Sequence, residues 1–108
     1  MGCKVFTVES EAGRVSLIKA FTLLAELHLN TVWIEAGATL NGALLESGLV
    51  DEWLIYMAPC VLGHEGRGLF HLPHIQRMSD KKPLQLTAIR QIGPDIRMIF
   101  TSSKFTTE

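Results

Sequence analysis

The segment from Thr31 to Gly63 restricts the fold of this chain more than any other part of the sequence. It places an apolar run that ends at Glu35 before a turn of small residues, and a second apolar run after a stretch with a helical pattern. An apolar strand that leads through a tight turn into a helix is the building unit of α/β proteins. The turn would direct backbone N–H groups and the positive end of the helix dipole at one point, which suits a phosphate.

Sequence periodicity extends this pattern over the first half of the chain. The sequence predicts a strand at 4–8, a turn at 10–14, an amphipathic helix at about 15–29, a strand at 31–35, a helix at about 39–46 that Gly48 stops, and a strand at 52–58. The helices are recognised by apolar spacing and the strands by β-branched and aromatic residues. We place the strand at 31–35 in the centre of a largely parallel sheet.

The second half of the chain predicts a loop followed by a hairpin. Glycines and prolines break all periodicity between 61 and 82, which indicates a long surface connection with room for one turn of helix. Alternating residues then predict strands at 84–91 and 96–101, joined by the turn residues Gly93-Pro94-Asp95. The pattern therefore adds an antiparallel hairpin to the α/β unit.

Composition limits the class of protein. The chain has 108 residues, of which 47% are hydrophobic and 19% charged, so we expect one domain, residues 1–108, that buries a core. The formal net charge is −1 and the basic residues are scattered, which argues against nucleic-acid and membrane partners. No stretch has the length of a signal peptide or a membrane span, and we expect a cytoplasmic protein.

The cysteines and histidines predict no metal site. Cys3 and Cys60 lie far apart without a CxxC spacing, and we expect Cys60 to be a small buried hydrophobe. The spacing of His64, His71 and His74 matches no common zinc pattern. No catalytic triad can be recognised. We expect the two tryptophans, which lie in strand patterns, to be core or interface residues.

Four short stretches of the sequence, taken together, resemble a known family. They are VWIEAGATL at 32–40, GLVDE at 48–52, Ala58-Pro59 with Leu62-Gly63, and IGPD at 92–95. In this order they resemble the C-terminal reductase domain of the bifunctional riboflavin-biosynthesis deaminase/reductase. The resemblance covers about 5–101, which corresponds only to the last half or so of that reductase domain. It implies an α/β, dihydrofolate-reductase-like mixed sheet, mostly parallel with a C-terminal antiparallel hairpin, flanked by helices.

The resemblance also implies an activity and a site. The family reduces 5-amino-6-(5-phosphoribosylamino)uracil to its ribitylamino product with NADPH. By position, Glu35 would contact the phosphoribosylaminopyrimidine substrate, and no catalytic residue is assigned. The segment that would wrap the pyrophosphate of NADPH consists of Gly37, Ala38, Thr39, Leu40, Asn41, Gly42 and Ala43.

Other interpretations of the same residues stay open. The turn after Glu35 would serve only as a helix cap in an assembly module without a ligand, and Glu35 itself could cap a turn or pair with an arginine. A protein that binds a nucleotide or phosphate without turnover is a further alternative. Because half a sheet leaves apolar surface and a strand edge uncovered, we also expect self-association, as a dimer.

Overall fold

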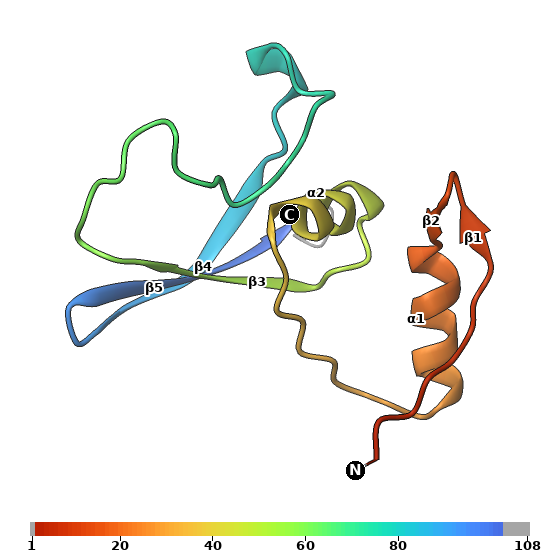
Figure 1. The fold of residues 1–108 in the computed structure, drawn as a ribbon. Helices are drawn as coiled ribbons and strands as arrows, with labels where there is room; N and C mark the ends of the chain where they lie inside the picture. The colour runs from red at the N-terminus through yellow and green to blue at the C-terminus, as the bar shows by residue number, and fades with distance from the viewer. Residues whose placement is uncertain (1, 103–108) are drawn as a thin grey trace. The chain divides into compact units, whose positions relative to one another are not determined.

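The chain divides into two compact units that are described separately. The structure is a computed structural model, and it describes residues 2–102. The first unit ends at Glu35 and the second begins at Ala36. Figure 1 shows the order of the helices and strands along the chain.

The first unit consists of a minimal hairpin followed by one helix. Strands β1 (Ser10–Glu11) and β2 (Arg14–Val15) pair antiparallel and are followed by α1 (Leu17–Glu26). The turn between the strands contains Ala12 and Gly13, both with positive φ, which confirms the predicted turn at 10–14. The predicted strand at 4–8 is wrong, because these residues have no strand partner in the described part of the chain.

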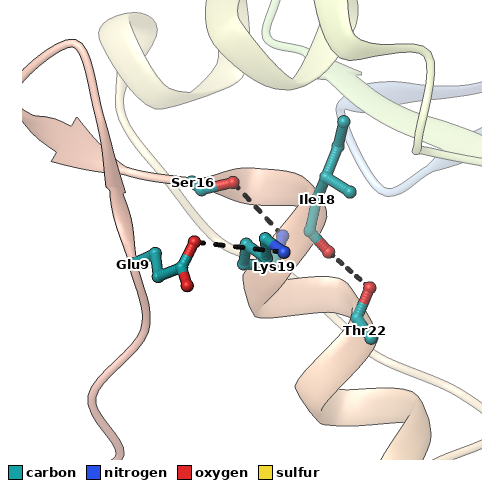
Figure 2. A network of polar contacts seen from close by, with 5 residues as sticks. All are labelled: Glu9, Ser16, Ile18, Lys19 and Thr22. Atoms are coloured by element: carbon teal, nitrogen blue, oxygen red, sulfur yellow. Dashed lines mark hydrogen bonds and ion pairs between the residues drawn. The ribbon is translucent and has the colours of Figure 1, made fainter.

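Side-chain contacts define the start of α1 (Figure 2). Ser16 is the N-cap, and its Oγ accepts a hydrogen bond of 3.3 Å from the backbone N–H of Lys19. The Lys19 Nζ lies 4.0 Å from Glu9 Oε2, and the Thr22 hydroxyl donates to the Ile18 carbonyl at 2.8 Å. The cap satisfies one of the N–H groups that a helix leaves unpaired at its start.

The end of α1 is a Schellman motif formed without glycine. His28 adopts a φ of 61°. Its N–H donates to the Ala25 carbonyl at 2.9 Å, and the N–H of Leu29 donates to the Leu24 carbonyl at 3.3 Å. This pair of reversed hydrogen bonds terminates a helix. The predicted helix at 15–29 is therefore confirmed, but it ends at Glu26.

Residues 31–35, predicted as a central parallel strand, form no strand in the structure. They are exposed and pair with no other segment among residues 2–102. A strand exists through hydrogen bonds to a neighbouring strand, and no described segment pairs with this one. All strand pairs in the described chain are antiparallel, so the expected parallel pairing is also absent from it.

The second unit begins with helix α2 (Ala38–Ser47), which confirms the predicted helix at about 39–46. Gly37 is its N-cap, and Gly48 ends it in the left-handed region with a φ of 72°. Leu44 on this helix is 2% exposed and is the one buried hydrophobic side chain among the described residues. The expected core is thus much smaller than the hydrophobic composition suggests.

A three-stranded antiparallel sheet forms the rest of the second unit. Its strands are β3 (Glu52–Met57), β4 (Leu84–Ile92) and β5 (Asp95–Ser102), in the order β3-β5-β4. The predicted strand at 52–58 and the predicted hairpin are confirmed. The connection between β3 and β4 contains one short 3₁₀ helix, η1 (Met78–Asp80), which fits the expected single turn.

The pairing register places mostly apolar side chains on one face of the sheet. Residues directly opposite each other point to the same side. This face, called the apolar face below, consists of Trp53, Ile55, Met57, Leu86, Ile89, Ile96, Met98 and Phe100, together with the polar Gln91. The Phe70 ring from the connection packs edge-on against Trp53, with ring centroids 5.1 Å apart. The other end of the face is open, because Met57 is 59% and Ile89 61% exposed.

Two predictions about single residues are corrected by the structure. Cys60 is exposed and not buried, because it follows Pro59 in the connection after β3 has ended. Trp33 is 69% exposed, since the segment that carries it is not part of a sheet. In the part of the chain that the structure describes, neither helix has the length and apolar character needed to cross a membrane.

Candidate functional site

The first turn of α2 leaves its backbone donors free. Gly37 precedes it in an extended conformation, with φ −85° and ψ −177°, and glycine offers no side chain to cap the helix. Within residues 2–102, no acceptor is recorded for the N–H groups of Ala38, Thr39 and Leu40. Gly37, Thr39 and Leu40 are exposed. The helix end therefore presents uncompensated N–H groups at the positive pole of the helix dipole.

The side chain of Asn41 is engaged in holding the turn. Its Nδ2 donates to the carbonyl of Ala36 at 3.2 Å and to the carbonyl of Leu69 at 3.4 Å. Both amide protons are thus directed at backbone of the same unit, one on each side of the helix start. Asn41 links the turn before α2 to the connection that crosses the helix.

Gly42 lies beneath that connection and is buried. A Cβ at this position would overlap the carbonyl oxygen of His71, and it would lie 2.9 Å from the His71 carbonyl carbon. The N–H of His71 also donates to the Ala38 carbonyl at 2.9 Å. The sequence placed Gly42 in the dinucleotide segment, and the structure shows a close packing contact that only glycine permits.

Glu35 carries an exposed carboxylate with a defined partner. Its Oε1 accepts a hydrogen bond of 3.1 Å from the indole Nε1 of Trp33. This contact differs from the turn cap or arginine pair that the sequence left open. The boundary between the two units falls directly after Glu35, so the predicted substrate contact and the predicted dinucleotide segment belong to different units.

The structure thus assembles part of the predicted segment at one place. Residues 37–40 lie together at the open end of α2, Ala43 is half-buried, the Asn41 side chain donates to the connection, and the backbone of Gly42 packs against it. Sequence reasoning missed the role of residues 69–71, which supply the backbone over the helix. No local signal in the sequence indicates that contact, because it joins residues nearly thirty positions apart.

Other candidate sites are weaker. Among the described residues, no three His, Cys, Asp or Glu side chains are arranged to hold a metal ion. A hollow of about 390 Å³ on the second unit contains none of the predicted site residues. It is lined by Glu46, His74, Ile75, Ser79, Asp80, Lys81 and Lys82.

Comparison with known proteins gives a consistent result. A family model described as the RibD C-terminal domain matches residues 3–98. The chain is 38% identical over 93 residues to the riboflavin biosynthesis protein RibD of Escherichia coli, covering 86% of this chain and 25% of that protein. It is 42% identical over 91 residues to a 5-amino-6-(5-phosphoribosylamino)uracil reductase of Buchnera aphidicola, covering 84% of this chain and 44% of that protein.

A solved structure of RibD from Acinetobacter baumannii is similar to the chain at the level of the backbone. The TM-score is 0.74 with 33% sequence identity, over 83% of this chain and 26% of the solved chain. The match confirms the dihydrofolate-reductase-like fold that the resemblance implied, as part of a domain. The chain spans between a quarter and a half of the length of the relatives named here.

Gly42→Ala should destabilise the second unit. The added methyl group must displace the backbone of His71, and overpacking of this kind costs about 1–3 kcal/mol. Urea unfolding followed by circular dichroism would measure the loss. Gly68→Ala is the matched control, since a Cβ there meets nothing within 4 Å. Equal midpoints for the two variants would contradict the contact between α2 and the connection.

Proposed function

Because the chain belongs to the RibD C-terminal domain family, we propose that it supplies part of an NADPH-dependent reductase of riboflavin biosynthesis. The substrate would be 5-amino-6-(5-phosphoribosylamino)uracil. The observation that carries this proposal is the 42% identity to a protein named as the reductase for that compound. Since the chain spans 44% of that reductase, the complete activity is proposed for an assembly that includes the remaining part of the domain.

The open end of α2 fits the pyrophosphate of a dinucleotide. A Cβ at Gly37 would meet nothing within 4 Å, so the backbone there is free for close approach. The N–H groups of residues 38–40 and the helix dipole would bind the negative charge. NADPH supplies the hydride when bound, and the role of these residues is to hold and orient it.

Glu35 is the proposed substrate contact. The hydrogen bond from Trp33 orients its carboxylate while leaving the group exposed. An ionised carboxylate accepts hydrogen bonds only, so it would bind the hydroxyl or amino groups of the substrate. Glu35 would therefore bind and orient the substrate, and it would take part in no covalent step.

Gly37→Val should weaken NADPH binding at least tenfold. A branched side chain at this position would block the approach of a phosphate to the N–H groups of the first turn, and tenfold corresponds to about 1.4 kcal/mol. Calorimetric titration with NADPH would give the dissociation constants. Gly68→Val is the matched control, because it makes the same change at a glycine that also has open space around its Cβ.

Two outcomes would contradict the proposed cofactor site. Unchanged NADPH affinity in Gly37→Val would place any binding elsewhere on the chain. Absence of binding by the parent chain would mean that the α2 end does not hold the cofactor without the rest of the domain. Binding without turnover of the substrate would instead favour the alternative of a non-catalytic nucleotide-binding protein.

Glu35→Gln should raise the dissociation constant of the substrate and leave that of NADPH unchanged. The amide oxygen of Gln can still accept from the Trp33 indole, so the substitution removes the charge and preserves the contact. A loss of about tenfold is expected for a hydrogen bond to a charged group. Titration of both compounds would separate the two effects, with the exposed Glu65→Gln as control. A parental substrate affinity would remove Glu35 from the site.

Self-association to a dimer is proposed from the uncovered parts of the sheet. In the described residues, β3 and β4 each pair on one side only, which leaves two strand edges open. The apolar face is also uncovered at Met57, Ile89 and Ile96, which are 59%, 61% and 39% exposed. Proteins avoid leaving such edges and faces in water, and a second copy of the chain would cover them.

Met57→Glu should shift the assembly toward monomer. A charge within the covered apolar face would be buried without a partner and would oppose association. Light scattering at micromolar concentration would measure the mass of the parent and the variant. Glu65→Gln serves again as a control, because Glu65 is exposed and lies outside the strands. A monodisperse monomeric parent would refute the proposed dimer.

A further inference from the structure

Three side chains form a transverse row across the sheet on the face opposite the apolar one. Arg97 lies on the central strand β5, and its direct partners are Tyr56 on β3 and Arg90 on β4. Direct partners point to the same side of a sheet, with Cβ atoms about 4.5–5.5 Å apart. The register thus places two arginines next to each other on one face, with a tyrosine beside them.

The charges of this row are not compensated by the described residues. Neither arginine has an ion pair or hydrogen bond through its side chain within residues 2–102. Asp95 lies two residues from Arg97 on the same face, but its carboxylate is not within 4.0 Å of a guanidinium. Like charges directly opposite each other in a sheet are destabilising.

Burial makes the missing partner more costly at Arg97. The Nε atom of Arg97 is buried and has no hydrogen-bond acceptor in the described chain. A buried N–H of a charged group loses its hydrogen bonds to water. Without a protein acceptor, this loss is not compensated and lowers the stability of the fold. The sheet therefore holds a donor that requires an acceptor from outside the described residues.

We propose that Arg90, Arg97 and Tyr56 bind an oxyanion, either a phosphate group or a carboxylate. Two adjacent guanidinium forks match the oxygen spacing of such groups, and the Tyr56 hydroxyl provides a further donor. A bound anion beside the exposed Arg90 would offset the repulsion between the two arginines. The row shares no residue with the α2 site, so this inference goes beyond the proposed function.

Titration with inorganic phosphate tests the site directly. Phosphorus NMR at constant ionic strength should show saturable binding to the parent chain, weakened at least tenfold in Arg90→Gln. Arg67→Gln is the matched control, because Arg67 is an exposed arginine in the connection. Saturable phosphate binding of equal strength by the parent and Arg90→Gln would place the anion elsewhere and overturn the proposal.

Arg90→Glu provides a second test that does not depend on added ligand. The new carboxylate would lie directly opposite Arg97 and replace the external anion. In chloride buffer this variant should unfold at higher urea concentration than Arg90→Gln, and phosphate should not shift its midpoint. If the two variants unfold at the same urea concentration in chloride, a negative charge opposite Arg97 does not stabilise the sheet, which contradicts the proposal.

Sedimentation distinguishes the two sources of the oxyanion. If phosphate binds the parent with no change in mass, the site accepts a free phosphate group. If phosphate does not bind and Arg90→Gln alone converts an oligomer to a monomer, the acceptor is a carboxylate of a second copy. The proposal is overturned if phosphate does not bind the parent and the parent and Arg90→Gln have the same oligomeric mass.

Discussion

The second unit depends on the close contact between α2 and the connection that crosses it. Gly42 permits the approach, the hydrogen bond from His71 to the Ala38 carbonyl holds it, and Asn41 ties the preceding turn to Leu69. Phe70, between these anchors, reaches the sheet at Trp53. One set of short contacts therefore links helix, connection and sheet.

The chain presents more apolar and charged surface than its own elements satisfy. A single hydrophobic side chain is buried in the described residues, the apolar face of the sheet is partly open, and the buried Nε of Arg97 lacks an acceptor among them. The chain covers about a quarter of the RibD proteins of Escherichia coli and Acinetobacter baumannii to which it is similar. The proposed dimer and the proposed anion would both bind at these uncovered surfaces.

Local patterns allowed much of the second unit to be predicted. The helix that Gly48 ends, the strand after Asp51 and the hairpin around Gly93-Pro94 all depend on interactions between near neighbours in the sequence. The open turn at Gly37 belongs to the same class, because a glycine before a helix leaves the first N–H groups without a side-chain cap. The end of α1 at His28 was not predicted, since a non-glycine residue with positive φ gives no clear sequence signal.

The sequence by itself determined the secondary structure of the second unit, the position of the glycine turn and the family resemblance, because these follow from local propensity and ordered motifs. Only the tertiary structure decided that residues 31–35 form no strand, that Gly42 packs beneath His71 and that Arg90 lies opposite Arg97. The physical reason is that strand pairing, close packing and charge proximity arise between residues far apart in the chain. Their energies depend on which partners are present, and local sequence does not contain that information.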